Sequence, residues 1–340
     1  MGRYNAVALA HDNDKTNHSS RAAQLSPRDL CGLLLPITTP FQNDGALNLD
    51  GLRSNIKKWN QSGIAGYVML GSTGERVHLD EREYVQLIET AREEVPNGFA
   101  FIAGAGQQST RGTIAEIKRA VAVGADGVLV ITPHFYRAAV TQAALVEHYN
   151  EVADGSPVPV ILYNMPDLTG IVIEPETVAT LSRHKNIIGV KDSSADIESL
   201  EKTISLVRNN SVRPEEFAVL TGNGTVLYEA LRVGAQGAIL AVGCVAPAVC
   251  AQILEAAKND NNGRATELQQ HLTPLARAVT KTYGIGGLKA ALDLIGYAGG
   301  PVRAPLRSPG REAIIEITSL LESASAMPDT SELVLEEFAP

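Results

Sequence analysis

The segment IIGVKDSS, residues 187–194, is the clearest guide to the structure and chemistry of this chain. Its first four residues are apolar or small, and a turn-forming cluster follows them, which is typical of a fully buried strand. Lys191 continues this run without a break. Because burying an ammonium group costs several kcal/mol unless the group is paired, a lysine at the end of a buried strand needs an explanation.

Two explanations are open from this stretch alone. Lys191 could extend to solvent or pair with Asp192, which is the commoner situation for an isolated lysine at a strand end. Alternatively it could be a nucleophile, because desolvation favours the neutral form of an amine and a neutral amine attacks carbonyl carbon. The rest of the chain favours the nucleophile.

Eight short apolar runs alternate with amphipathic stretches from residue 32 onward. Apolar strands that alternate with helices predict a parallel sheet covered by helices. Eight such units predict a TIM (β/α)8 barrel, an α/β fold, with a doubly wound open sheet as the alternative. The predicted strands are 32–38, 66–70, 99–103, 127–131, 158–163, 187–191, 217–221 and 237–242.

The same pattern sets the expected domain boundaries. Residues 1–28 are polar and form neither a signal peptide nor a clean transit peptide, so we expect a flexible leader. Residues 29–245 form the barrel, and 246–326 form its last helix and a C-terminal helical extension. The acidic residues 327–340 are expected to be a loose tail.

Composition excludes several classes of function. The net charge of −9, from 29 basic and 38 acidic residues, argues against nucleic acid or an anionic membrane as the main partner. No apolar run reaches the roughly 18–20 residues of a membrane span. The cysteines, Cys31, Cys244 and Cys250, lie outside any CxxC pattern, so we expect a reducing compartment, the cytoplasm, with a mitochondrial address left open. The histidines show no HxH or HxxxH spacing, and no metal site is predicted.

Candidate chemistry lies at the ends of the predicted strands, where TIM barrels carry their active sites. Gly-Ser-Thr-Gly-Glu, residues 71–75, offers hydroxyl and backbone N–H groups that suit a carboxylate, although it is also an ordinary turn sequence. Tyr163 ends the fifth strand and Lys191 the sixth, so both would face one mouth. Lysine can form an imine with an α-keto acid, and a phenol can transfer protons. The protonated imine is then the electron sink, and no cofactor is needed.

Three motifs together carry a family resemblance: Gly-Ser-Thr-Gly-Glu at 71–75, Tyr-Asn-Met-Pro at 163–166 and Gly-Val-Lys-Asp-Ser at 189–193. With them the chain resembles, over about residues 30–322, the pyruvate-dependent class I aldolases of the dihydrodipicolinate synthase and N-acetylneuraminate lyase superfamily. The resemblance implies a TIM barrel with a C-terminal helical extension, usually assembled as a homotetramer that is a dimer of dimers.

The resemblance also implies roles for single residues. Lys191 matches the Schiff-base lysine, and Tyr163 matches the tyrosine that transfers protons. Ser72 and Thr73 match the pair that binds the pyruvate carboxylate, with Thr73 also linked to the tyrosine. Ile239 matches a residue on the eighth strand whose backbone carbonyl faces the substrate.

Two positions depart from the family pattern. Dihydrodipicolinate synthases carry an arginine for the second substrate's carboxylate where this chain has Leu168, which argues against lysine biosynthesis. A tyrosine that reaches across from a neighbouring subunit is replaced by Phe135. Either Tyr136 or water takes over the part of this tyrosine in proton transfer. Phe135 and Tyr136 are both expected at the substrate site.

The segments 283–289 and 296–306 look most like the 4-hydroxy-2-oxoglutarate aldolase branch, with the 2-keto-3-deoxy-L-galactonate type as close relatives. We therefore expect a lyase of carbohydrate-acid metabolism that reversibly cleaves a 4-hydroxy-2-keto acid to pyruvate and an aldehyde. The alternatives are an imine-dependent dehydratase or hydratase, or a dihydrodipicolinate synthase, of the same superfamily. An alternative from a different functional class is a barrel without catalytic activity that serves as a binding or regulatory protein.

Overall fold

The computed structural model describes residues 25–210 and 214–325, and its eight strands close into one barrel. Each strand runs parallel to the next, and the first pairs with the eighth through Leu34 and Ile239. The predicted TIM barrel is therefore confirmed, and the open doubly wound sheet is excluded. The strands are β1 (Gly32–Pro36), β2 (Gly66–Met69), β3 (Ala100–Ala105), β4 (Gly127–Ile131), β5 (Val160–Asn164), β6 (Ile187–Asp192), β7 (Ala218–Thr221) and β8 (Gly237–Ile239).

The strands read as continuous apolar runs because both of their faces are buried. One set of alternating side chains, including Val68, Ile102 and Ile161, fills the interior of the barrel. The other set, including Tyr67, Phe101 and Leu162, packs under the surrounding helices. The interior is thus a packed core and leaves the carboxyl ends of the strands as the place for a site.

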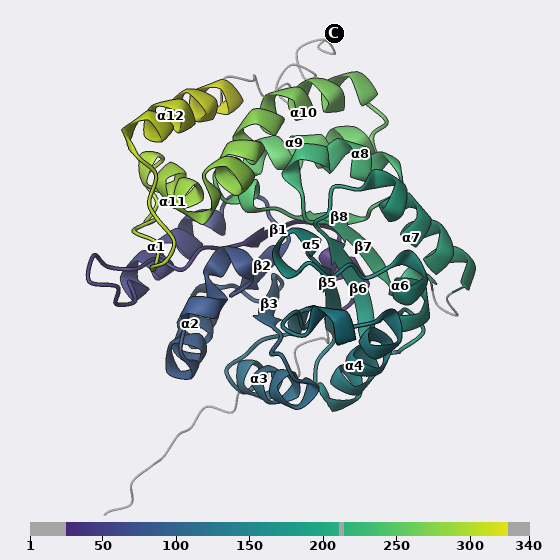
Figure 1. Cartoon of the computed structure of the whole chain (residues 1–340). Coiled ribbons are helices and arrows are strands. Elements are labelled where there is room, and N and C mark those ends of the chain that lie inside the picture. The colour runs from purple at the N-terminus through teal and green to yellow at the C-terminus, as the bar shows by residue number, and fades with distance from the viewer. Residues whose placement is uncertain (1–24, 211–213, 326–340) are drawn as a thin grey trace, which may run out of the picture.

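Helices surround the barrel in Figure 1, and several begin at the capping residues that the sequence offers. Asp80 forms a capping box with Glu83 at the start of α2, and Ser109 caps the next helix. The helices of this part are α1 (Leu49–Trp59), α2 (Glu81–Glu94), α3 (Thr110–Ala122), α4 (Gln142–Gly155), α5 (Pro166–Thr169), α6 (Pro175–Leu181), α7 (Ile197–Asn210) and α8 (Leu227–Arg232).

The C-terminal helices gather on one side of the barrel in Figure 1, and the carbonyl of Ala298, after α11 (Gly284–Leu294), accepts a hydrogen bond from Asn55 of α1. Within this extension α10 (Asn262–Arg277) contains Pro274, which cannot donate a backbone hydrogen bond, and a π-helical turn, Ala278–Thr282, follows it. The predicted eighth strand is too long, because Ala241–Cys244 form a 3-10 turn. These helices are α9 (Pro247–Lys258), α10 (Asn262–Arg277), α11 (Gly284–Leu294) and α12 (Arg311–Ser325).

The expected leader, 1–28, extends too far at its C-terminal end. Residues 1–24 lie outside the described residues, but Leu25 is buried in the interior cluster of the barrel. Pro27–Leu30 form a 3-10 helix whose start is closed by a capping box between Ser26 and Asp29. Residues 25–28 thus belong to the packed barrel. The expected tail, 327–340, also lies outside the described residues. Within 25–210 and 214–325, no helix is long and apolar enough to span a membrane.

Candidate active site

Lys191 and Tyr163 lie directly opposite each other on β6 and β5. A register shift after Val160 gives β6 one extra residue, so that Ile187 and Gly189 have consecutive partners on β5. Both Lys191 and Tyr163 are buried, with 4% and 3% of their surface exposed. The Lys191 Nζ lies 4.3 Å from the centre of the Tyr163 ring. The structure thus brings the two predicted residues together at the carboxyl end of the barrel.

Asp192 does not neutralise the neighbouring lysine. Its Oδ2 accepts a hydrogen bond from Asn164 Nδ2 at 2.6 Å, and its Oδ1 accepts from the backbone N–H and the hydroxyl of Ser194. Among the described residues, Lys191 has no carboxylate within ion-pair distance. The pairing that explained Lys191 as a structural residue is therefore not what the structure shows.

Gly222 makes room for the lysine side chain. A Cβ at this position would lie 2.6 Å from Lys191 Cε and 1.9 Å from Ser193 Oγ, so a larger residue on the chain after β7 could not coexist with them. The Ser193 hydroxyl is buried and has no hydrogen-bond partner in the described structure. Ser193 belongs to the Gly-Val-Lys-Asp-Ser motif, but nothing in the sequence indicates that its hydroxyl lies buried against Gly222.

The hydroxyl that meets the Tyr163 phenol belongs to Ser72. The two oxygens are 3.0 Å apart, at hydrogen-bonding distance. The expected partner was Thr73, which is buried in the same loop. The loop starts at Leu70 and ends at Glu75, two residues that adopt left-handed backbone conformations with φ of 55° and 53°. Such conformations cost about 1 kcal/mol or more in non-glycine residues, so surrounding contacts must hold this loop.

The remaining predicted residues lie in different environments. Ile239 ends β8 and is buried in the same interior cluster as Tyr163. Phe135 and Tyr136 follow β4 and are each 73% exposed. Their rings are in edge-to-face contact, with 5.0 Å between the ring centres. Within a single chain the two aromatic residues therefore stand in solvent. Leu168, on the turn after β5, is 56% exposed.

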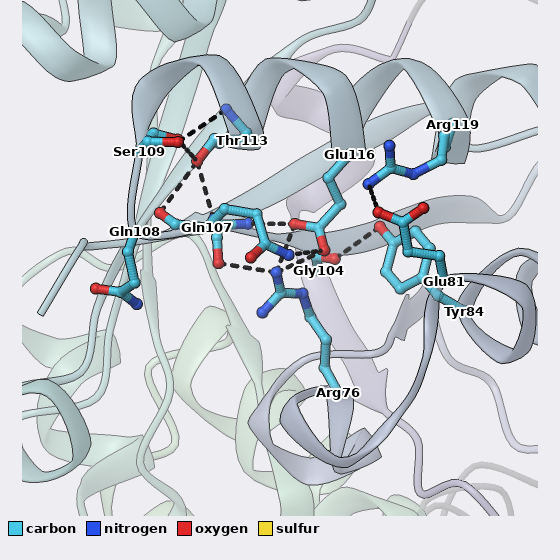
Figure 2. A network of polar contacts seen from close by, with 12 residues as sticks. Arg76, Glu81, Tyr84, Gly104, Gln107, Gln108, Ser109, Thr113, Glu116 and Arg119 are labelled. Carbon is cyan, nitrogen blue, oxygen red and sulfur yellow. Dashed lines mark hydrogen bonds and ion pairs between the residues drawn. The ribbon is translucent and has the colours of Figure 1, made fainter. Parts of the chain in front are cut away.

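A buried ion pair beside the loop 70–75 was not predicted from the sequence. Arg76 follows the Gly-Ser-Thr-Gly-Glu motif and pairs with Glu116 of α3, as Figure 2 shows. The Glu116 carboxylate also accepts the backbone N–H of Gly106 and the side-chain amide of Gln107, both at 2.8 Å. Arg76 in turn donates to the Gly106 carbonyl at 2.8 Å. The network connects the chain that follows the loop 70–75 to the end of β3.

No group of three His, Cys, Asp or Glu side chains that could hold a metal ion occurs in the part of the chain that the structure describes. The titratable side chains at the mouth are instead an amine and a phenol. Their arrangement suits a covalent imine with a neighbouring proton donor.

The family model described as the dihydrodipicolinate synthetase family matches residues 29–324. The chain belongs to this family. Its members are lyase-type enzymes that form a Schiff base with a lysine and need no metal, so the expected covalent mechanism without a cofactor is confirmed for the family.

Individual relatives carry one activity in their names. The 4-hydroxy-tetrahydrodipicolinate synthase of Methanothrix thermoacetophila is 34% identical over 296 residues, which are 86% of this chain and 97% of the relative. That of Methanoculleus marisnigri is 36% identical over 277 residues, 81% of this chain and 92% of the relative. A solved structure of YagE from E. coli K12, a prophage protein of the dihydrodipicolinic acid synthase family in complex with pyruvate, is 30% identical with a TM-score of 0.81. The match covers 87% of this chain and 99% of YagE.

These relatives contradict the main functional expectation. Proteins at 34% and 36% identity over most of the chain are named as synthases, not as aldolases that cleave 4-hydroxy-2-keto acids. The emphasis on carbohydrate-acid metabolism is without support for the same reason. The synthase, which stood as an alternative, is the better supported reading. Leu168, which argued against a synthase, is one position only and does not outweigh this similarity over most of the chain.

Proposed function

We propose that this chain joins pyruvate to an aldehyde through an imine at Lys191, in the manner of the 4-hydroxy-tetrahydrodipicolinate synthases that it resembles. The observation that carries the proposal is a buried lysine, without a carboxylate partner in the described structure, directly opposite a tyrosine on the next strand. The family of the chain supports the same chemistry.

The reaction begins when the Lys191 amine attacks the keto carbon of pyruvate and water leaves. The protonated imine draws electrons from the methyl group, which loses a proton and becomes an enamine carbon. This carbon attacks the aldehyde, and the Tyr163 phenol, next to Ser72, is placed to move protons to and from the reacting oxygens. Attack of water, or of an amine in the product, on the imine carbon then frees the lysine.

Ser72 and Thr73 hold the pyruvate carboxylate in this proposal. Both lie on the loop between β2 and α2, which also presents backbone N–H groups near the mouth. The Ser72 hydroxyl is shared with Tyr163, so carboxylate binding and proton transfer depend on the same side chain. The backbone carbonyl of Ile239, the buried residue that ends β8, faces the substrate in this proposal.

Arg137 is the cation that we assign to the second substrate. A Cβ on Gly170, two residues after Leu168, would lie 3.1 Å from Arg137 Nη1, so this guanidinium rests against the turn where the family arginine is missing. Arg137 has no carboxylate partner among the described residues. Removing pyruvate from a tetrahydrodipicolinate skeleton leaves a four-carbon amino aldehyde with one carboxylate, a group that a guanidinium binds with charge-assisted hydrogen bonds.

We also propose that the chain assembles as a homotetramer and acts in the cytoplasm. Val77, Phe135 and Tyr136 are large apolar or aromatic side chains at 77%, 73% and 73% exposure, which supports a protein contact at this end of the barrel. The three cysteines are free thiols, as in a reducing compartment. Light scattering after size exclusion measures the assembly directly.

The function is tested by adding pyruvate together with aldehydes that do or do not carry a carboxylate, including aspartate semialdehyde. We expect consumption of pyruvate only with a carboxylate-bearing aldehyde, and a reduced pyruvyl group on Lys191 when borohydride is added. Pyruvate consumption without any trapped imine would contradict the proposal.

A further inference from the structure

A second buried lysine lies behind the Ser72 loop, here defined as residues 70–75. The Nζ of Lys289, on α11, donates a hydrogen bond of 2.6 Å to Glu75 Oε1. The side chains of the two residues are 1% and 0% exposed. The ion pair therefore joins the last residue of the Ser72 loop to the C-terminal helical extension and is shielded from bulk solvent.

Both partners of this pair are held by further contacts. Lys289 also donates to the Pro301 carbonyl at 2.7 Å, and its ammonium lies 4.3 Å from the centre of the Phe41 ring. Glu75 Oε2 accepts the backbone N–H of Arg303 at 3.0 Å. Burial lowers the pKa of Lys289, and the hydrogen bond to Glu75 opposes that shift. The pair thus occupies one geometry, with its hydrogen-bonding groups satisfied.

The segment that follows α11 is clamped against the same residues. A Cβ at Gly299 would lie 1.9 Å from the Lys289 carbonyl oxygen, and one at Gly300 would lie 2.5 Å from the Phe41 carbonyl oxygen. Gly300 also has a φ of +69°, which favours glycine. Close backbone packing at Gly299 and Gly300 therefore fixes the position from which Lys289 binds the Glu75 carboxylate.

The Ser72 loop needs such a fixed point. Left-handed conformations at Leu70 and Glu75 cost free energy and persist only where contacts outside the loop enforce them. The Glu75 backbone N–H donates to the Ser72 carbonyl at 3.1 Å, and the Ser72 hydroxyl meets the Tyr163 phenol at 3.0 Å. A continuous set of contacts thus runs from Lys289 through Glu75 and Ser72 to Tyr163.

We infer that the Lys289–Glu75 pair positions the Ser72 hydroxyl against Tyr163, and that the C-terminal extension in this way contributes to the reaction. The inference rests on the imine chemistry proposed above. Lys289 and Glu75 are positioning residues, because neither touches the reacting atoms. Their loss acts through the placement of Ser72, and a misplacement of about 1 Å can lower a rate on the order of 10²-fold.

The test replaces both charges together, as Lys289→Met with Glu75→Gln, so that no unpaired charge stays buried. The control is Arg92→Met with Asp126→Asn, a partly exposed pair whose side chains are 23% and 31% exposed. Arg92 pairs with Asp126 at 3.1 Å and lies 4.7 Å from the centre of the Phe101 ring, but at the opposite, amino end of the strands. Thermal stability and the rate of borohydride trapping with pyruvate are measured for each protein.

We expect the Lys289/Glu75 variant to trap pyruvate about tenfold or more slowly, and the control to stay within about twofold. In a Ser72→Ala background the same double change should slow trapping little further, because the contact of the Ser72 hydroxyl with Tyr163 is already lost. If the double change slows trapping by the same factor with and without Ser72, or if the control slows it equally, the inference is wrong while the proposed function stands. A wild-type protein that traps no pyruvate overturns the proposed function and the inference with it.

Discussion

The Nζ of Lys191 lies 4.3 Å from the centre of the Tyr163 ring, and this contact depends on one extra residue in β6. Side chains of a strand alternate between its two faces, so a shift of one position exchanges the faces. The register shift after Val160 pairs Lys191 with Tyr163 and Asp192 with Asn164. The amine and the phenol thus share the mouth of the barrel, and the carboxylate of Asp192 is used in hydrogen bonds to Asn164 and Ser194.

The first prediction concerns the nucleophile. Pyruvate and borohydride should add one reduced pyruvyl group, on the peptide that contains Lys191. Lys191→Ala should abolish both labelling and turnover. Lys191→Arg should not restore either, since a guanidinium stays protonated and cannot form the imine. Mass spectrometry of the digested protein gives the site, and a label on Lys289 instead would contradict the assignment.

Sequence reasoning reached the barrel and the two central residues because both follow from patterns along the chain. Apolar runs identify the strands, and the ends of adjacent parallel strands must meet. The partner of the phenol was misassigned to Thr73, because the direction of a side chain in the turn depends on the left-handed conformations of Leu70 and Glu75. A sequence without glycine at these two positions gives no sign of such conformations.

The long-range contacts were beyond sequence reasoning for a different reason. Glu75 and Lys289 are 214 positions apart, and nothing in either local sequence specifies the other. Likewise, Arg137 meets the turn at Gly170 only after the loops that follow β4 and β5 have folded. Leu168 alone does not exclude a cation for the second substrate, because Arg137 on the neighbouring loop lies against the same turn at Gly170.

The second prediction separates the hydroxyl groups of the Ser72 loop. Tyr163→Phe should lower kcat on the order of 10²-fold or more, the usual size of a general acid–base contribution, while some imine still forms. Ser72→Ala should lower kcat more than Thr73→Val, because Ser72 is the residue 3.0 Å from the phenol. Steady-state kinetics with pyruvate and a saturating aldehyde measure both effects. Near-normal kcat in Tyr163→Phe would refute the proton-transfer role.

The third prediction concerns the aldehyde. Arg137→Leu should reduce kcat/KM for a carboxylate-bearing aldehyde by roughly 10- to 100-fold, since a hydrogen bond to a charged group contributes about 1.5–3 kcal/mol. The rate of pyruvate trapping should not change. Arg183→Leu, at an exposed arginine after α6, is the control and should match the wild type in both assays. A slower trapping rate in Arg137→Leu would show that the arginine serves pyruvate instead.

The fourth prediction concerns His148, a buried residue of α4 whose Nδ1 lies 2.9 Å from the Thr110 hydroxyl. Burial lowers the pKa of His148 from 6.5 to about 4, because the charged imidazole is poorly solvated. The unfolded chain therefore binds a proton at a higher pH than the folded chain does. Native stability from this group is full above about pH 6.5 and is lost as the pH falls towards 4.

Comparison of the wild type with His148→Gln tests this sign. The free energy of unfolding of the wild type should fall by about 2 kcal/mol more than that of the variant between pH 7.5 and pH 5, from 1.36 kcal/mol for each pH unit. Urea unfolding at the two pH values gives both free energies. Parallel losses in the two proteins would show that His148 is not the titrating group.

The last prediction uses the buried pair of Arg76 and Glu116. The Glu116 side chain is 6% exposed and that of Arg76 is 12% exposed, so the carboxylate is the partner that water reaches less. Arg76→Met leaves this carboxylate buried with only the hydrogen bonds from Gly106 and Gln107, and should destabilise the fold by about 3–5 kcal/mol. Glu116→Gln should cost less, because an amide oxygen can still accept the Gly106 N–H and the Arg76 side chain stays partly exposed to solvent.

The double variant Arg76→Met/Glu116→Gln should be more stable than Arg76→Met alone, since no unpaired charge is then buried. Denaturant unfolding of the three variants measures these differences, and a double variant whose loss equals the sum of the single losses would show that the two side chains do not act as a pair.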